Sequence, residues 1–148
     1  VYAASGGATT TTSVDLSKKY SGWARQNMEL NGFFGKNYRF IQADCQQWLK
    51  QCDKKYNLIF LDPPTFSNSK SMKETLDIQR DHVDLLKDTL KLLLPGGTCV
   101  FTNNLRNFIM QFEPKTGYKV SEITKKTIDN DFARNPKIHN SWIITKER

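Results

Sequence analysis

The five residues Asp62-Pro63-Pro64-Thr65-Phe66 combine an acid, two prolines and an aromatic ring in one short loop. The prolines fix their own φ angles and remove two backbone donors, and a proline after Asp62 holds that residue extended. The loop is therefore predicted to be a stiff platform with a carboxylate at its base. The Phe66 ring could stack on a planar base drawn into a pocket. The alternative is a rigid turn with Phe66 buried in the core.

Three predicted strands in succession end in an acid, namely Asp15, Asp44 and Asp62. Ligands of open α/β sheets bind beyond the carboxyl ends of the strands, so these carboxylates are expected to point into one crevice. One carboxylate there can accept hydrogen bonds from both hydroxyls of a ribose, and the next can accept one from an adenine amino group. The third would stand nearest the reacting group. The alternative is that each aspartate only forms a turn.

Strands and helices must alternate to place these acids at one edge. Strands are predicted over 10–15, 38–43, 56–61, 98–102, 118–124 and 139–145, and helices over 17–31, 45–52, 76–94 and, as a short element, 105–112. The last two strands are joined by a polar loop without a predicted helix. This order predicts an α/β fold with a Rossmann-like, doubly wound, mostly parallel sheet and a C-terminal antiparallel hairpin.

Apolar spacing predicts what each element buries. The strand core Leu58-Ile59-Phe60-Leu61 is continuously apolar, which predicts burial on both faces. The first long helix, capped by Ser17, would share one face among Tyr20, Trp23, Ala24, Asn27 and Met28. The helix over 76–94 would end at Pro95-Gly96-Gly97 and carry a stripe of Val83, Leu86, Leu90 and Leu93.

Composition narrows the class of protein. A length of 148 residues suits one compact domain, and the net charge of +7 favours a polyanionic partner such as nucleic acid. A basic surface without such a partner is an equally good interpretation. Three cysteines are too few for a disulfide framework, which indicates a reducing, cytosolic setting. No cysteine and histidine spacing indicates a zinc site, and no apolar run approaches the roughly 20 residues of a membrane helix.

The loop 62–66 resembles the Asp/Asn-Pro-Pro-aromatic motif of class I S-adenosylmethionine-dependent methyltransferases that modify nucleic acids. Four longer strings resemble the C-terminal (K) half of the bacterial bifunctional ribosomal RNA large subunit methyltransferase K/L family. They are residues 61–70, Gln79-Arg80-Asp81-His82, Phe101-Thr102-Asn103-Asn104 and residues 131–135. This resemblance extends from residue 1 to about residue 145.

The resemblance implies a cytoplasmic enzyme that uses S-adenosylmethionine, without a metal, to make 7-methylguanine in 23S ribosomal RNA. A second methyltransferase half would lie in the same full-length polypeptide. Asp15, with Leu16 beside it, would hold the cofactor ribose, and Asp44, with Cys45, would hold the adenine. Asp62, Pro63, Pro64 and Phe66 would form the wall between the methyl group and the target base.

The resemblance departs from the family at the beginning of the chain. The family's cofactor loop, a Phe-x-Tyr-Thr-Gly type of segment after the first strand, is absent. Gly6-Gly7 cannot replace it, because a ribose acid follows a glycine loop by about 20 residues, whereas Gly7 lies just before the strand that ends at Asp15. Val1 to Ser5 are predicted to be the tail of a helix. We therefore expect 1–148 to be a fragment of a methyltransferase domain whose first strand precedes residue 1.

The residue types also favour one chemistry. Cytosine 5-methylation needs a cysteine nucleophile, which related enzymes carry just after the strand at 98–102, and Phe101-Thr102-Asn103-Asn104 has none. Cys99 lies within the strand and is expected in the core. Guanine nitrogen 7 carries a lone pair and needs neither a base nor a covalent intermediate, so alignment suffices. We expect Asp62 to stabilise the charge left on the methylated purine.

Several basic residues flank the strand ends where substrate would enter. RNA phosphate contacts are expected from Lys70, Lys73, Arg80, Arg134, Lys137 and His139. The alternative for each is a solvated surface position, and His82 and His139 are expected to be structural or RNA-contacting. Two other functions stay open, namely an amino-group methyltransferase acting on adenine or guanine and a non-catalytic RNA-binding module with the same fold.

Overall fold

The computed structural model describes residues 1–67 and 75–148 and divides into two compact units, Val1–Gln51 and Cys52–Arg148. In the first unit, β1 (Thr11–Asp15) pairs in parallel with β2 (Tyr38–Gln42). Three helices accompany them: α1 (Tyr2–Ser5), α2 (Lys18–Leu30) and α3 (Cys45–Gln51). Each predicted element of this unit is confirmed to within two residues at its ends.

Local capping sets the start of α2, but tertiary packing covers little of it. The Ser17 hydroxyl accepts a hydrogen bond from the Tyr20 backbone N–H at 3.2 Å, as expected for an N-cap. Of the predicted apolar face, only Met28 is buried, whereas Tyr20 and Trp23 are 57% and 51% exposed. The predicted face is therefore mostly uncovered in the first unit. A sheet of two five-residue strands offers too little surface to cover a whole helix face.

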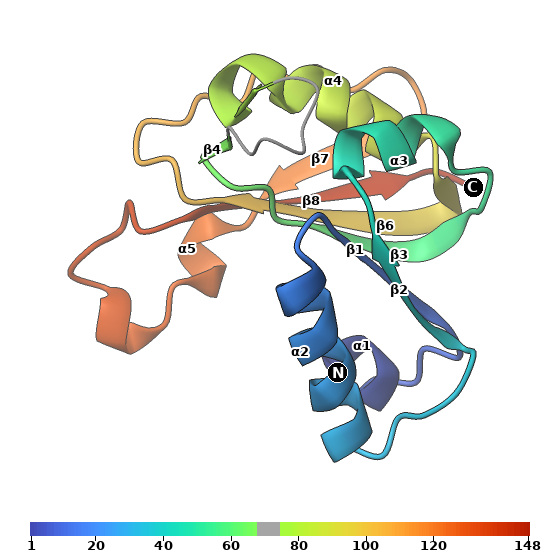
Figure 1. Ribbon diagram of the computed structural model, residues 1–148. Coiled ribbons are helices and arrows are strands. Elements are labelled where there is room, and N and C mark those ends of the chain that lie inside the picture. The colour runs from blue at the N-terminus through green and yellow to red at the C-terminus, as the bar shows by residue number, and fades with distance from the viewer. Residues whose placement is uncertain (68–74) are drawn as a thin grey trace. The chain divides into compact units, whose positions relative to one another are not determined.

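The second unit contains a four-stranded mixed sheet in the order β3-β6-β8-β7 (Figure 1). β3 (Tyr56–Leu61) and β6 (Leu93–Asn103) are parallel, whereas β8 (Asn140–Lys146) is antiparallel to both β6 and β7 (Tyr118–Glu122). This arrangement confirms the α/β class and the C-terminal antiparallel hairpin. The remaining elements are the short pair β4 (Phe66–Ser67) and β5 (Leu76–Asp77), α4 (Ile78–Leu90), α5 (Thr124–Thr127) and the 3-10 helix η1 (Asn130–Phe132).

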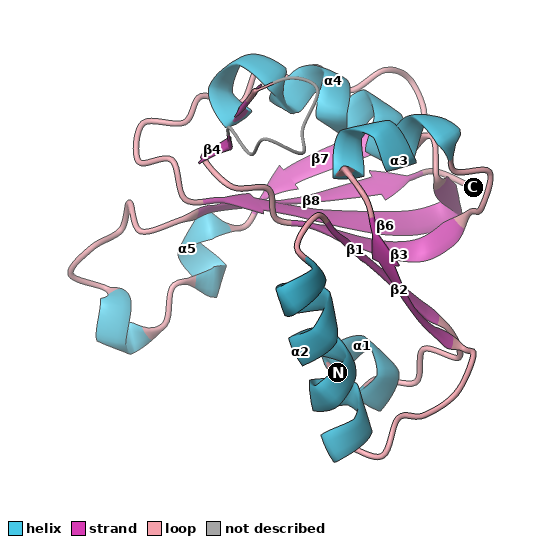
Figure 2. Ribbon diagram, in the orientation of Figure 1, coloured by secondary structure: helices cyan, strands magenta, loops and turns pink. Residues whose placement is uncertain are grey.

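The core of the second unit lies between α4 and the sheet, as Figure 2 shows. α4 packs on β6, and its predicted apolar residues Leu86 and Leu90 are buried. The strands contribute the fully buried Cys99, Phe101 and Ile144. No helix among residues 1–67 and 75–148 is long and apolar enough to cross a membrane.

The prediction that α4 continues to Pro95-Gly96-Gly97 is wrong. The helix ends at Leu90, and the Pro-Gly-Gly segment lies inside β6, which begins at Leu93. Leu93 pairs with Tyr56, and the register then shifts before Leu58 pairs with Thr98. This irregularity takes up the Pro-Gly-Gly segment, so that pairing with β3, rather than local turn preference, sets the boundary.

Two further predictions about local structure are corrected. Residues 105–112 form no helix, because the segment is held by side chains of α4 in place of its own helical hydrogen bonds. The polar connection between β7 and β8 contains α5 and η1, for which no helix was predicted.

The burial predicted on both faces of β3 is wrong for one face and partial for the other, where Ile59 and Leu61 are half-buried. Ile59 and Leu61 pair with the buried Cys99 and Phe101 of β6. Leu58 and Phe60, which point to the other face, are 56% and 66% exposed. Within the described residues of the second unit, β3 is an edge strand. α4 covers the face of the sheet opposite to the one that carries Leu58 and Phe60.

Gly97 is expected to tolerate no side chain. A Cβ atom there would lie 2.8 Å from the Leu94 carbonyl oxygen and 3.1 Å from that of Asn57. Since backbone atoms cannot move aside cheaply, Gly97→Ala should lower the free energy of unfolding by about 2 kcal/mol. Urea unfolding of the 148-residue chain measures this.

Gly22→Ala is the matched control, because Gly22 lies inside α2 and an added Cβ meets no atom within 4 Å. It should be neutral or raise stability by up to about 1 kcal/mol. A Gly97→Ala chain as stable as the Gly22→Ala chain would contradict the close packing at β6.

Candidate functional site

Asp15 and Asp44, which follow neighbouring strands of the first unit, each use one carboxylate oxygen to shape a turn. Asp15 Oδ1 accepts the Ser17 backbone N–H at 2.6 Å. Asp44 Oδ1 accepts those of Gln46 at 2.9 Å and Gln47 at 3.3 Å. In the part of the chain that the structure describes, the second oxygen of each has no hydrogen-bond partner. The turn-forming role is therefore real, and it leaves one acceptor oxygen on each acid.

The two carboxylates converge on the Cys45 thiol. The thiol donates to the Val14 carbonyl oxygen at 3.5 Å, while the Ala43 N–H donates to the Asp15 carbonyl oxygen at 3.2 Å. Loss of solvation around the sulfur, followed by the negative charges of Asp15 and Asp44, raises the pKa of Cys45 to about 11. Two carboxylates near one thiol, each with an oxygen left to accept, suit a ligand that brings hydroxyl and amino donors.

Leu16, the remaining predicted cofactor residue of the first unit, is half-buried and follows Asp15 directly. Its backbone carbonyl oxygen accepts a long hydrogen bond, 3.4 Å, from the Gln42 side-chain amide. This contact ties the turn after β1 to the end of β2. The first unit therefore brings its four predicted cofactor residues, Asp15, Leu16, Asp44 and Cys45, to one edge of its sheet.

Asp62, in the second unit, is exposed and is held by one hydrogen bond from a neighbouring strand. Leu61 pairs with Phe101 in parallel register, so the next residue of each strand is also adjacent. There, the Thr102 hydroxyl donates to Asp62 Oδ1 at 2.5 Å. The other Asp62 oxygen has no partner among the described residues and can accept a further hydrogen bond. No local pattern in the sequence predicted Thr102 as a partner of Asp62.

The rest of the loop is fastened to the start of α4. The Ile78 N–H donates to the Thr65 carbonyl oxygen at 3.1 Å, and Phe66 pairs with Asp77 in a short antiparallel bridge. Asp77 is also the N-cap of α4. The Phe66 side chain is 58% exposed, so the alternative that it is buried in the core is wrong.

Two more segments begin at the same edge of this sheet. Asn103, at the end of β6, pairs with Asn140, at the start of β8. The Asn140 side-chain amide donates to Asn103 Oδ1 at 3.1 Å and to the Leu105 carbonyl oxygen at 2.8 Å. The loop after β6 and the connection before β8 therefore both adjoin the end of β6, where Thr102 holds Asp62. The Asn103-Asn104 string is visible in the sequence, but no local pattern predicted Asn140 as the pairing partner of Asn103.

The predicted RNA contacts have different surroundings. Lys70 and Lys73 lie outside the described residues. Arg80 forms a two-point pair with Asp81, with N···O distances of 2.6 and 2.7 Å, and donates to the Thr75 carbonyl oxygen. Hydrogen bonding from Arg80 is the main reason that the pKa of Asp81 lies below its usual value. Arg80 is thus a partly neutralised cation.

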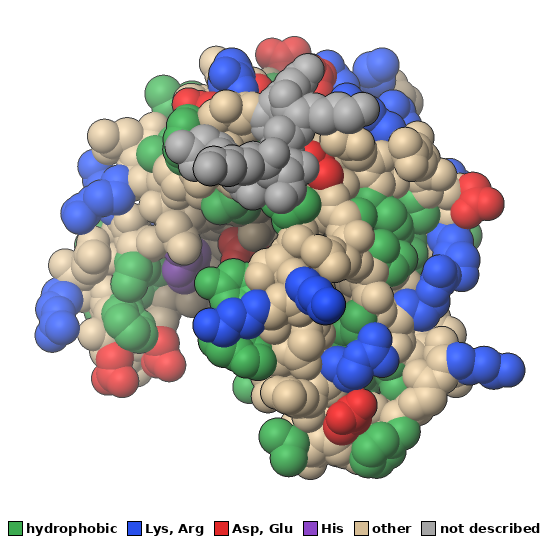
Figure 3. All heavy atoms as spheres, viewed as in Figure 1, with side chains coloured by type: hydrophobic (Ala, Val, Ile, Leu, Met, Phe, Trp, Pro, Cys, Tyr) green, Lys and Arg blue, Asp and Glu red, His purple; other side chains and the backbone are tan. Residues whose placement is uncertain are grey.

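The other three lie in the connection between β7 and β8. Arg134 and Lys137 are exposed, and His139 Nε2 lies 2.8 Å from the Thr127 hydroxyl oxygen. Lys125 and Lys126 on α5, which no sequence pattern singled out, are exposed in the same connection. On the face that Figure 3 shows, basic and acidic side chains are interspersed, so charge alone does not mark an interface.

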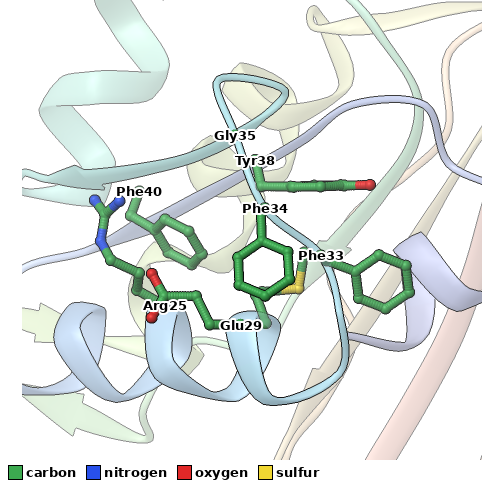
Figure 4. Close-up of a pocket in the computed structure, with 8 residues that line it drawn as sticks. Arg25, Glu29, Phe33, Phe34, Gly35, Tyr38 and Phe40 are labelled. Atoms are coloured by element: carbon green, nitrogen blue, oxygen red, sulfur yellow. The ribbon is translucent and has the colours of Figure 1, made fainter.

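A shallow pocket of about 50 Å³ lies in the first unit, between the second half of α2 and the start of β2 (Figure 4). The Arg25 guanidinium stacks 4.9 Å from the Phe40 ring centroid, and Phe34 at its rim is 67% exposed. This pocket is at the amino end of β2, whereas Asp44 follows the carboxyl end. It therefore does not coincide with the predicted cofactor residues.

Two of the three cysteines, Cys45 and Cys99, are poor nucleophiles. Burial raises the pKa of the Cys99 thiol to about 12, and that of Cys45 is about 11. Both are therefore thiols near neutral pH, as expected of residues that do not attack a base. Within the described ranges, no group of three or more His, Cys, Asp and Glu side chains could hold a metal ion.

Comparison with known proteins gives concordant results. A family model described as conserved hypothetical protein 95 matches residues 1–117. The ribosomal RNA large subunit methyltransferase K/L of Allochromatium vinosum is 53% identical over 146 residues, covering 97% of this chain and 20% of that protein. The protein of the same name from Shewanella amazonensis is 52% identical over 147 residues, covering 98% and 21%. The chain thus spans about a fifth of the length of these curated relatives.

Solved structures share the fold. A protein described as a methyltransferase complexed with SAH has a TM-score of 0.78 at 23% identity, covering 97% of this chain and 40% of its own. The SAM-dependent methyltransferase from Agrobacterium tumefaciens has a TM-score of 0.67 at 21% identity, covering 98% and 50%. The resemblance found in the sequence strings is therefore confirmed.

Alkylation of Cys45 tests whether the charges of Asp15 and Asp44 both act on its thiol. Because its raised pKa leaves little thiolate, Cys45 should react with iodoacetamide at pH 8 roughly 10- to 100-fold more slowly than a cysteine in a short peptide. The rate should rise as the pH approaches 11. Asp15→Asn or Asp44→Asn removes one of the charges and should speed the reaction, while Glu29→Gln on α2 should not. Equal rates in all four chains would mean that the two carboxylates do not act on this thiol.

Proposed function

The chain belongs to the conserved hypothetical protein 95 family, and we propose that it is the greater part of an S-adenosylmethionine-dependent methyltransferase domain acting on ribosomal RNA. The observation that carries the proposal is the loop 62–66, with an exposed carboxylate held by Thr102 and an exposed ring beside α4. The names of the curated relatives and the shared fold support it.

The cofactor would be held first by the acids of the first unit. Asp15 and Asp44 each keep one oxygen free of partners among the described residues, which fits the ribose hydroxyls and the adenine amine. S-adenosylmethionine supplies, when bound, a methyl group on a positively charged sulfur. No residue here must serve as a redox group or metal ligand for that transfer. Whether the crevice includes Asp62 as well stays a prediction.

For the finer chemistry, we propose guanine nitrogen 7 in 23S ribosomal RNA. The ring of Phe66 would stack on the base, and Asp62 would lie beside it. Nitrogen 7 uses its own lone pair to form the new bond to the methyl carbon, the bond from sulfur to that carbon breaks, and the positive charge passes to the purine. Asp62 would stabilise this charge electrostatically, with Thr102 fixing its orientation.

A ribosomal RNA substrate also bears on the RNA-contacting residues, the cellular location and the rest of the polypeptide. Arg134, Lys137 and His139, together with Lys70, Lys73 and Arg80, would contact RNA phosphates. An enzyme of bacterial ribosomal RNA would work in the cytoplasm. The relatives are about five times as long as the chain, which supports a second methyltransferase half in the same polypeptide.

An amino-group methyltransferase is the second candidate. It is favoured by one observation, the Asp62 oxygen without a described partner, which could accept the N–H of an exocyclic amine. The two chemistries differ in their product. Mass spectrometry of the methylated nucleoside, combined with borohydride and aniline cleavage at 7-methylguanine, separates them.

Asp62→Asn in the enzyme that carries this domain is the main test. Asparagine keeps an oxygen that can accept from Thr102, but it carries no charge, so turnover of ribosomal RNA should fall roughly 10- to 100-fold. Asp53→Asn, an exposed acid preceding β3, is the matched control and should leave turnover unchanged. Unchanged turnover in Asp62→Asn would remove the electrostatic role. A wild-type enzyme without activity on any RNA would favour the non-catalytic binding module.

The isolated chain should bind S-adenosylmethionine weakly or not at all. We propose that a strand preceding residue 1 in the longer polypeptide pairs with β3 and that the segment after it covers Leu58 and Phe60. That segment would also supply the missing cofactor loop. Calorimetry of the 148-residue chain, compared with the longer polypeptide, measures the difference, and tight binding by the short chain would refute the need for the loop.

A further inference from the structure

The first turn of α4 holds the loop after β6 through a side chain that imitates a strand. The Gln79 side-chain N–H donates to the Ile109 carbonyl oxygen at 3.0 Å, and Gln79 Oε1 accepts the Ile109 backbone N–H at 2.9 Å. Both backbone groups of one residue are thus satisfied by one carboxamide. This fixes Ile109 in position and orientation, as a neighbouring strand would.

His82 provides a second tie, one turn further along the helix. The ring is fully buried, and Nδ1 lies 3.0 and 2.9 Å from the carbonyl oxygens of Ile78 and Gln79. Since carbonyl oxygens only accept, the proton belongs on Nδ1, and Nε2 accepts the Gln111 backbone N–H at 3.0 Å. The neutral ring therefore bridges helix and loop in a single tautomer.

An aromatic cluster backs the same loop. The Phe108 ring packs edge-on against His82 with centroids 4.7 Å apart, and it also contacts the rings of Phe101 and Trp142 at 5.9 and 5.3 Å. Inside the loop, the one backbone hydrogen bond found among the described residues runs from the Phe108 N–H to the Leu105 carbonyl oxygen. The shape of the loop thus depends on Gln79, His82 and Phe108.

The exposed side chains of the loop take no part in its packing against α4 and the aromatic cluster. Ile109 is 66% exposed, and Arg106 and Asn107 are exposed beside the turn. If the loop served only to close the core, two hydrogen bonds to the backbone of a residue whose apolar side chain points to solvent would not be expected. A single exposed apolar side chain is common on protein surfaces, but a firmly held backbone preorganises Ile109 for a contact.

The same helix start holds the loop that carries Phe66. Ile78 binds the Thr65 carbonyl oxygen, and Asp77 pairs with Phe66. We propose that Gln79 and His82 are positioning residues that fix residues 105–111 as a second wall of the target-base site, next to Phe66, with Ile109 as its apolar contact. This inference rests on the proposed function and adds to it a part of the site that positions the RNA substrate.

Two variants of the full enzyme test the inference. Gln79→Ala removes both hydrogen bonds to Ile109, and His82→Asn withdraws the acceptor for Gln111. Each should raise the KM for ribosomal RNA at least 10-fold while leaving the Kd for S-adenosylmethionine within 2-fold. Hydrogen exchange of the Ile109 and Gln111 amides should quicken at least 10-fold, which reports the loop directly.

Two further variants separate positioning from stability. His82→Gln places an amide oxygen where it can reach the Gln111 N–H and should recover much of the affinity for RNA. Thr89→Val alters another fully buried polar residue of α4, whose hydroxyl bonds, among the described residues, to the Leu85 carbonyl oxygen alone. It should change the unfolding midpoint without changing the KM for RNA.

Two results would overturn the inference. The first is unchanged exchange of the Ile109 and Gln111 amides in Gln79→Ala and His82→Asn. The second is a freed loop with an unchanged KM for RNA. If the wild-type enzyme proves inactive, the proposed function fails, and the Kd of a 23S RNA fragment for the same variants still decides whether the loop is a binding wall.

Discussion

The parallel pairing of β3 with β6 is the constraint on which the second unit depends. It brings Asp62 beside Thr102, so that a carboxylate at the end of one strand is oriented by a hydroxyl at the end of the next. An exposed acid on an unsupported loop would sample many rotamers. Held by one short hydrogen bond and two prolines, it is preorganised, and preorganisation is what electrostatic stabilisation of a developing charge requires.

From that edge, side chains rather than regular secondary structure shape the surface. Gln79 and His82 hold the loop after β6, while Asn140 ties the start of β8 to the end of β6. Each of these bonds joins residues about 30 or more positions apart. A surface built in this way can present exposed groups such as Phe66 and Ile109 on a rigid backing, which ordinary loops do not provide.

The first unit shows how one carboxylate can close a turn and still leave an oxygen available to a ligand. One oxygen of Asp15 and one of Asp44 close the turns that follow their strands. Both carboxylates also lie near the Cys45 thiol, whose pKa is raised first by lost solvation and then by their negative charges. Turn formation and ligand binding are therefore not competing explanations for a strand-terminal aspartate, because its two oxygens can be used separately.

Local patterns in the sequence determined the strand ends at Asp15 and Leu61 and the cap at Ser17, because periodicity and capping act over a few residues. They also determined the stiff loop at Asp62, since proline restricts its own backbone. Tertiary structure decided the rest. Pairing with Tyr56 drew Pro95-Gly96-Gly97 into β6, and bonds from Gln79 and His82 kept 105–112 from being a helix. Phe60, predicted to be buried, is exposed because no described element of the second unit packs on its face of β3. These outcomes depend on partners distant along the chain, and no short pattern records which partner will be there.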